Sequence, residues 1–235
     1  MSILPKLSVP KYSLIIPSTK ERVSYRPYLV REEKILMIAS ESEDSDQIQT
    51  ALIDLVAECL DYKGDVNKLT NCDLEYIFLQ LRGKSVGDKI DILKTCVECD
   101  ASNDVTIDIS TVTVIDHSPK DGIIRLSDDL SLELNYPTLG NKIDYNSNDS
   151  DTEVLIKSVA TALAVVYYGE ETYNAADTPI EERIEFVEGF SNAQFQQAVD
   201  YLLMAPYVEY SSEFTCSKCG HKEKFSYTGI IDFFI

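Results

Sequence analysis

The chain has 235 residues, of which 44% are hydrophobic and 26% charged, a composition typical of a folded globular protein with a sizeable core. Its 40 acidic and 21 basic residues give a formal net charge of −19, which disfavours nucleic acid as a partner because affinity for phosphates depends mainly on Lys and Arg. The longest apolar run, residues 160–168, is too short to cross a bilayer, and residues 1–10 lack the apolar stretch of a secretory signal, so we expect no membrane partner and a cytoplasmic location.

The first part of the chain predicts a β-hairpin followed by a helix. Residues 12–25 alternate apolar and polar side chains on either side of a Pro-Ser-Thr-Lys turn at 17–20. From Val30 the pattern changes to that of an amphipathic helix. The residues expected on the inner side of this helix are Ile35, Leu36, Ile38 and Ala39.

Two more helices are expected before residue 87. Residues 48–60 place apolar side chains at i, i+3, i+4 and i+7, which predicts one buried face. The next helix begins at Thr70, with Asp73 three residues later as a variant of the capping box, and Gly83 fits the position where the helix would stop. These segments predict a hairpin and helical region over residues 1–86.

Residues 87–135 predict β-structure. Apolar residues alternate with polar ones on both sides of a Cys-x-x-Cys pair at 96–99 and continue across a turn at 118–122. Residues 145–151, rich in Asn, Ser and Asp, are expected to form a loop.

The chain then returns to helix over residues 150–205 and to strand over 205–235. One helix is expected to run from Val154 to near Gly169. Two more begin at capping boxes, the first at 178–181 with proline at the first helical position and the second at 191–194. The tail holds a second Cys-x-x-Cys pair between two strand patterns.

Six cysteines are present, and four of them form the two pairs. Cys59 and Cys72 lie singly in helical apolar patterns and are expected in the core. The spacing of each pair lets both sulfurs bind one metal ion, and Gly220 permits the positive φ that such a turn often requires. Because four thiolates leave no open coordination position, we expect a structural zinc ion (Zn²⁺) with the ligands Cys96, Cys99, Cys216 and Cys219.

Other interpretations of the two pairs are open at this point. The pairs could be redox-active, although a redox pair usually opens a helix in a βαβ unit and neither pair does so. They could also be reduced and free of metal. His221 could replace one of the cysteine ligands.

The predicted fold class is α+β. An N-terminal β-hairpin with helices (residues 1–86) precedes a second domain (87–235). In this domain, residues 87–135 and 205–235 form a zinc-ribbon-like β module from the two cysteine turns, and the helical region 150–205 is inserted between them.

The sequence offers no catalytic constellation. Its two histidines, His117 and His221, are far apart, and no metalloprotease motif, Gly-rich phosphate loop or nucleophile elbow is found. Neighbouring carboxylates are expected by chance in so acidic a chain. We therefore expect that the protein is not an enzyme.

Several blocks of the sequence resemble baseplate proteins of T-even-type contractile-tailed phages (myoviruses). The most specific is residues 25–36, Tyr-Arg-Pro-Tyr-Leu-Val-Arg-Glu-Glu-Lys-Ile-Leu. It is preceded by the Pro-Ser-Thr motif of residues 14–19 and followed by the acidic segment Glu-Ser-Glu-Asp at 41–44. Residues 74–82, both cysteine pairs and the ending 230–234 also look like this family. The resemblance covers nearly the whole chain.

The resemblance implies a baseplate hub subunit or a hub assembly factor and supplies no catalytic residues. It implies phage baseplate hub proteins and the tape-measure protein as partners, and a location in the host cytoplasm during assembly or in the tail baseplate of the virion. A transient assembly factor, a permanent structural subunit of the hub and a host-directed zinc module are three alternatives, and the match along the whole chain counts against the third. The acidic surface either keeps the protein soluble or steers it toward a basic partner.

The candidate contact with a partner is the segment just before the first helix. Arginine and aromatic residues are common binding hot spots. The residues expected to contact a partner are Arg26, Tyr28 and Leu29. The alternative is that Tyr28 and Leu29 pack the hairpin on the helix.

Overall fold

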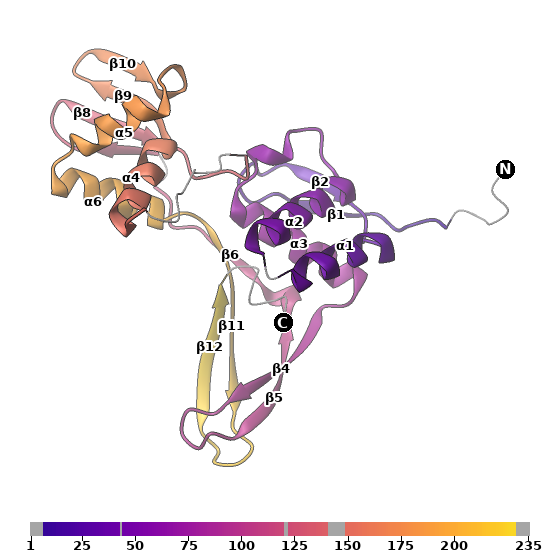
Figure 1. Ribbon diagram of the computed structural model, residues 1–235. Helices are drawn as coiled ribbons and strands as arrows, with labels where there is room; N and C mark the ends of the chain where they lie inside the picture. Colours follow the sequence, from indigo (N-terminus) through magenta and orange to yellow (C-terminus); the bar gives the residue numbers. More distant parts are fainter. Residues whose placement is uncertain (1–6, 43, 120–121, 141–148, 229–235) are drawn as a thin grey trace, which may run out of the picture. The chain divides into compact units, whose positions relative to one another are not determined.

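The structure is a computed structural model that describes residues 7–42, 44–119, 122–140 and 149–228 (Figure 1). The chain forms two compact units: unit 1 comprises residues 1–115 and 207–235, and unit 2 comprises residues 116–206. Unit 1 contains both the N-terminal helices and the two cysteine hairpins, which the sequence analysis assigned to separate domains, and unit 2 is an insertion between two parts of unit 1. The predicted α+β class is confirmed.

The predicted N-terminal hairpin is confirmed in unit 1. Strands β1 (Tyr12–Ile15) and β2 (Arg22–Tyr25) pair antiparallel, and the short β3 (Leu60–Asp61) adds to β2. The turn of the hairpin is fixed by a buried carboxylate: Ser18 donates to Asp73 from its backbone amide at 2.9 Å and from its hydroxyl at 2.6 Å. Because Asp73 also caps the helix that follows Thr70, one side chain joins the hairpin to that helix.

Three helices pack beside this sheet: α1 (Val30–Glu41), α2 (Ser45–Cys59) and α3 (Asn71–Ser85). The buried face of α2 is the predicted one, and both singly placed cysteines, Cys59 and Cys72, are buried in the core as expected. A 3₁₀ turn, η1 (Val66–Lys68), leads into α3.

Part of the predicted inner side of α1 is wrong. Leu36 and Ala39 are buried, whereas Ile35 and Ile38 are exposed. The helix is apolar on two sides, so its sequence does not decide which side packs, and the structure buries the stripe that also contains Glu32.

The predicted end of the third helix at Gly83 is also wrong, because α3 continues to Ser85. Gly83 instead lies inside the helix, next to the Asp88 side chain. A Cβ atom at this position would lie 2.3 Å from the Asp88 carboxylate oxygen. The chain turns at Gly87, which has a φ of +135° that favours glycine.

Two long hairpins complete unit 1. Strands β4 (Lys89–Thr95) and β5 (Ser102–Asp108) form the first, and β11 (Tyr207–Thr215) and β12 (Lys222–Thr228) form the second. After η2 (Ile109–Thr111), the short β6 (Thr113–Ile115) pairs with β11. Figure 1 shows the two hairpins side by side, with both turns at the same end.

Unit 2 contains a four-stranded antiparallel sheet with the order β10-β9-β8-β7. Its strands are β7 (Ile123–Arg125), β8 (Leu130–Leu134), β9 (Leu163–Tyr168) and β10 (Glu171–Asn174). Its helices are α4 (Asp151–Ala162), η3 (Ala175–Asp177), α5 (Ile180–Glu188) and α6 (Asn192–Leu203).

The predicted helix from Val154 to near Gly169 is too long, because it ends at Ala162 and the chain continues directly as β9. The β9 sequence Leu-Ala-Val-Val-Tyr-Tyr is rich in β-branched and aromatic residues, and pairing with both β8 and β10 outweighs the helical periodicity. Gly169, at a φ of +61°, lies in the turn between β9 and β10.

One of the two capping boxes predicted in unit 2 is confirmed. Ser191 accepts a hydrogen bond from the Gln194 amide, and the Gln194 side chain accepts from the Ser191 amide. The box predicted at residues 178–181 does not form, because Pro179 is itself the residue before α5 and makes no side-chain cap.

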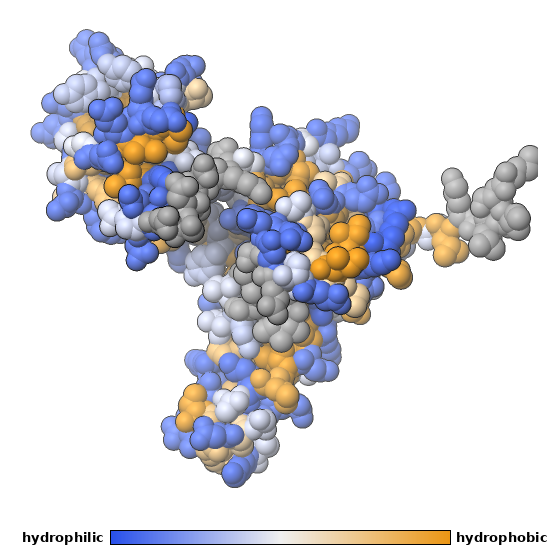
Figure 2. Space-filling view, viewed as in Figure 1, coloured by the Kyte–Doolittle hydropathy of each residue, from blue (hydrophilic) through white to orange (hydrophobic). Residues whose placement is uncertain are grey.

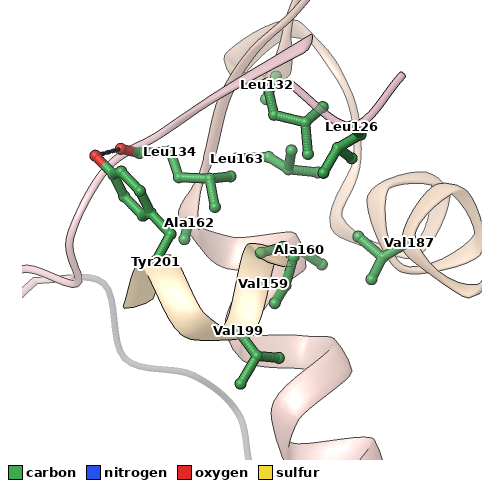
Figure 3. Close-up of a cluster of buried hydrophobic side chains, with 12 residues drawn as sticks. Leu126, Leu132, Leu134, Val159, Ala160, Ala162, Leu163, Val187, Val199 and Tyr201 are labelled. Carbon is green, nitrogen blue, oxygen red and sulfur yellow. Dashed lines mark hydrogen bonds between the residues drawn. The ribbon is translucent and has the colours of Figure 1, made fainter. Parts of the chain in front are cut away.

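The helices of unit 2 cover one face of its sheet and enclose an apolar core (Figure 3). Leu132 and Leu134 from β8 meet Val159 from α4 and Val199 from α6. The Tyr201 hydroxyl donates to the Leu134 backbone carbonyl at 3.2 Å, which joins α6 to β8.

Three sequence expectations fall on residues that the structure leaves out. The turn at 118–122 and the loop at 145–151 lie partly outside the described residues, and the ending 230–234 lies wholly outside them. None of the helices in the described part of the chain is long and apolar enough to cross a membrane. On the face shown in Figure 2, hydrophilic side chains cover most of each unit, with smaller apolar groups between them.

Candidate metal centre

The tips of the two long hairpins bring the four paired cysteines together. The turn from β4 to β5 carries Cys96 and Cys99, and the turn from β11 to β12 carries Cys216 and Cys219. All four sulfurs lie within 4.8 Å of one another. The Sγ atoms of Cys96 and Cys219 are 3.7 Å apart, as are those of Cys99 and Cys216. The cysteines could therefore hold one metal ion.

The separation of the sulfurs fits a tetrahedral ion. Four thiolates at about 2.3 Å from a zinc ion lie about 3.8 Å from one another, whereas a disulfide joins its sulfurs at about 2.05 Å. The observed 3.7 Å matches the tetrahedral edge, and all four cysteines are free of disulfides. Because the four positions are filled by cysteine, the site has the composition of a structural metal centre.

The two turns have the same backbone. In the first, the Cys96 amide donates to the Ala101 carbonyl at 2.9 Å and the Asp100 amide donates to the Cys96 carbonyl at 3.0 Å. In the second, the Cys216 amide donates to the His221 carbonyl at 2.8 Å and the Gly220 amide donates to the Cys216 carbonyl at 2.9 Å.

The residue after the second cysteine of each turn lies in the left-handed region. Gly220 has a φ of +75°, as the sequence predicted, and Asp100 takes the equivalent position with a φ of +54°. Aspartate is one of the few residues other than glycine that tolerate this conformation. The missing glycine in the first turn therefore does not change its geometry.

The sulfurs differ in their affinity for protons. Backbone amides of Cys219 and Lys218 donate to the Cys216 sulfur and lower its pKa to about 6. The His221 amide acts on Cys219 in the same direction, but hydrogen bonding with the Cys99 thiol and burial outweigh it and raise the pKa of Cys219 to about 12. A divalent cation would hold all four sulfurs as thiolates, since it compensates their mutual repulsion.

A buried asparagine that the sequence analysis missed joins the two hairpins beside the cysteines. Asn103 lies on β5, and its side-chain oxygen accepts from the Ser217 amide at 2.9 Å and from the Ser217 hydroxyl at 3.0 Å. Its Nδ2 donates to the Ala101 carbonyl at 2.9 Å and lies 3.7 Å from the Cys216 sulfur. Such contacts orient metal ligands from outside the coordination shell.

A second contact joins the hairpins farther from the tips. The Lys94 ammonium on β4 lies 4.9 Å from the centre of the Phe225 ring and 5.5 Å from that of Tyr227, both on β12. Phe225 also packs edge-on against Phe214 at 6.2 Å. The sulfur cluster is therefore supported by contacts between the same two hairpins, and His221 is not part of the cluster.

The residues predicted to contact a partner lie just before α1. The Arg26 guanidinium bonds the carboxylates of Glu32 and Glu58, each at 3.2 Å, and its side chain is 18% exposed. Tyr28 is only 8% exposed, and its amide donates to the Ser85 hydroxyl at 2.9 Å. Leu29 is the most exposed of the three predicted residues, at 37%.

Glu32 holds this segment together. Burial alone would raise its pKa, but hydrogen bonds from Arg31, from the Leu29 amide and from Arg26 outweigh burial and lower the pKa to about 2. The Leu29 amide donates to the Glu32 carboxylate at 2.6 Å, and Arg31 donates at the same distance. Glu32 therefore remains ionised and fixes the first turn of α1.

Comparison with known proteins agrees with the resemblance seen in the sequence. Residues 9–235 match the model of the family described as T4 bacteriophage base plate protein. Searches of curated proteins and of solved structures gave no match. Because the family match covers nearly the whole chain, the chain belongs to the family of T4 bacteriophage base plate proteins.

Proposed function

We propose that this protein is a non-enzymatic assembly factor of the phage baseplate hub, which binds hub or tape-measure components in the host cytoplasm while the tail is built. The observation that carries the proposal is an apolar surface on α1, which we call the α1 outer face. It consists of Val30, Ile35, Met37 and Ile38, which are between 55% and 80% exposed. Exposed apolar groups that cluster on one element are typical of protein interaction sites.

The α1 outer face suits a helical partner. The residues at the start of the helix fix its position, since Arg26 and Glu32 pair behind it and Tyr28 is buried. Leu29 extends the outer face at its N-terminal end. An exposed, rigid and apolar helix can pack against the apolar stripe of another helix, and such stripes are expected on hub and tape-measure components before they assemble.

The charge of the chain supports a reversible interaction. A net charge of −19 gives long-range attraction to a basic partner, and this attraction weakens as salt increases. Helical spacing places Lys34 on α1 between Val30 and Ile38, where its ammonium offers a pairing position for an acidic residue of the partner. A permanent subunit of the hub is the alternative role, and it would use the same face.

We further propose that the metal held by the cysteines is zinc and that its role is structural. The support is the set of four cysteine ligands at tetrahedral separation. A zinc ion would join turns whose cysteines are up to 123 positions apart in sequence, and would thereby tie the end of the chain to its middle.

The experiment compares exposed substitutions on α1 with matched ones elsewhere in unit 1. Met37→Glu together with Ile38→Glu changes two exposed side chains of the outer face. Val86→Glu together with Leu93→Glu changes two apolar side chains outside α1 that are at least as exposed. Each pair is supplied from a plasmid to cells infected by a phage that lacks this gene.

We expect the α1 pair to fold with an unchanged Tm, to lose binding to hub or tape-measure components, and to leave tails unassembled, whereas the control pair restores phage growth. Full restoration of growth by the α1 pair would contradict the proposed role of this face.

A further inference from the structure

Unit 2 contains a pocket of about 450 Å³, whereas the cysteine cluster and α1 belong to unit 1. Its lining comes from β8 to β10 of the sheet, from η3, and from α5. In Figure 1, α5 lies next to β9 and β10. The volume is within the range of about 300–1,000 Å³ that is usual for ligand sites.

Most of the pocket surface is apolar. Leu163 forms part of its inner wall and belongs to the buried core shown in Figure 3, and Val166 and Phe186 line the space between the sheet and α5. Tyr168 and Tyr173 flank the pocket, and at least half of each side chain is exposed. The wall therefore suits an aliphatic chain or an aromatic ring.

One cation lines this apolar space. The Arg183 side chain comes from α5, and its Nε is buried without a hydrogen-bond acceptor among the described residues. Its Nη1 donates to the Ala160 carbonyl at 3.5 Å, which is the limit for a hydrogen bond.

The lack of an anion beside Arg183 is unexpected in so acidic a chain. Acidic residues outnumber basic ones by 40 to 21, yet no carboxylate in the described part of the chain lies within 4.0 Å of this guanidinium. Glu182 also lines the pocket, but it is exposed, and water screens its charge. A guanidinium on an apolar wall without an ion pair is costly, and the charge of a bound anion compensates it.

We infer that this pocket binds an apolar group joined to a carboxylate, with the apolar group between the sheet and α5 and the carboxylate on Arg183. A guanidinium binds a carboxylate through two parallel hydrogen bonds and thereby fixes its orientation. The inference concerns unit 2 alone and is independent of the proposed assembly role.

Two sources carry this chemistry, a free fatty acid and a protein segment with an acidic residue beside an apolar one. Decanoate represents the first. The peptide acetyl-Thr-Phe-Thr-Glu-Thr-Val-amide represents the second, since residues two apart in an extended segment lie on the same side. Decanol, which has the same chain without the charge, is the reference for apolar binding.

The test is calorimetric titration of the full-length protein with each compound. We expect decanoate or the peptide to bind more tightly than decanol. Arg183→Gln should lower the affinity for the acidic compound about ten-fold and leave the affinity for decanol unchanged. Arg125→Gln removes the same charge from an exposed position on β7 and is expected to have no effect. Tighter binding of decanoate identifies a free acid as the source, and tighter binding of the peptide identifies a protein segment.

A second variant keeps the test valid if Arg183→Gln does not fold. Thr178→Asp places a carboxylate on the pocket wall and leaves Arg183 in place. It should therefore lower the affinity for the acidic compound and leave the affinity for decanol unchanged. Equal affinities for decanoate, peptide and decanol, an acidic compound that binds Arg183→Gln as tightly as the native protein, or no binding of any compound would overturn the inference.

Discussion

The side-chain oxygen of Asn103 accepts two hydrogen bonds from Ser217, one from the amide at 2.9 Å and one from the hydroxyl at 3.0 Å. The two residues belong to different hairpins and are 114 positions apart in sequence. The same asparagine lies against the Cys216 sulfur. The two halves of the metal centre are therefore aligned by protein contacts as well as by the cysteines.

This alignment predicts the effect of removing the amide. Asn103→Ala should lower the free energy of unfolding by about 1–3 kcal/mol, because it leaves buried polar groups without partners. It should also weaken zinc binding by about 10- to 100-fold, as is typical when a contact behind a metal ligand is lost. Urea unfolding and competition with a chelator measure the two effects. Asn67→Ala, at an exposed asparagine on η1, is the control, and equal effects of both variants would show that the link is unimportant.

The metal centre predicts a defined metal content. The purified protein should contain about one zinc ion per chain, because both turns contribute to a single tetrahedral site. Cys216→Ser should abolish binding and lower the unfolding temperature. Cys72→Ala, a change in a cysteine buried in the helical core, should destabilise the protein but leave the zinc content unchanged. Elemental analysis of protein purified under reducing conditions checks this, and a stable, metal-free native protein would disprove it.

Substitutions at the left-handed residues of the two turns, Gly220 and Asp100, should have opposite effects on stability. Gly220→Ala should lower the free energy of unfolding by about 1–2 kcal/mol. The cause would be backbone strain alone, because nothing lies within 4 Å of the added Cβ. Asp100→Gly should be neutral or should stabilise by up to about 1 kcal/mol, because glycine adopts this conformation without strain. Thermal unfolding of the zinc-loaded variants measures both, and a change of the same sign at both positions would contradict the equivalence of the turns.

Glu32 predicts a dependence of stability on pH. Its pKa falls from an ordinary value of 4.5 to about 2 in the folded protein, so its contribution is present above about pH 4.5 and is lost as the pH falls toward 2. Glu32→Gln should therefore lower the stability at pH 7 by about 3 kcal/mol, and the difference from the native protein should shrink below pH 4.5.

Comparing variants at each pH separates this effect from loss of the metal in acid, which affects both proteins. Glu41→Gln, at an exposed residue of the same helix, should leave the profile unchanged. A difference between Glu32→Gln and the native protein that stays constant from pH 7 to pH 3 would argue against the ion-pair network around Arg26.

Local signals in the sequence predicted the parts of the fold that depend on neighbours along the chain. The hairpin at 12–25, the capping boxes at Thr70 and Ser191, and both cysteine turns were of this kind. Their residues fix the local backbone directly, through turn geometry, capping hydrogen bonds or metal-ligand spacing.

The errors arose where tertiary contacts decide the outcome. Residues 163–168 continue a helical pattern, but two neighbouring strands hold them in a sheet. Ile35 and Ile38 look as apolar as Leu36, and only packing shows that they are exposed. Asn103 and Arg183 gave no signal at all, since a single polar residue becomes notable only when distant segments bury it.

The central claim, that this baseplate protein acts during assembly of the hub, is tested most directly by counting its copies. Quantitative mass spectrometry would compare purified virions with hub intermediates isolated from the same infection. We predict that the protein is abundant in the intermediates and nearly absent from virions. A fixed number of copies in both would contradict a transient assembly factor and would identify a permanent subunit of the hub.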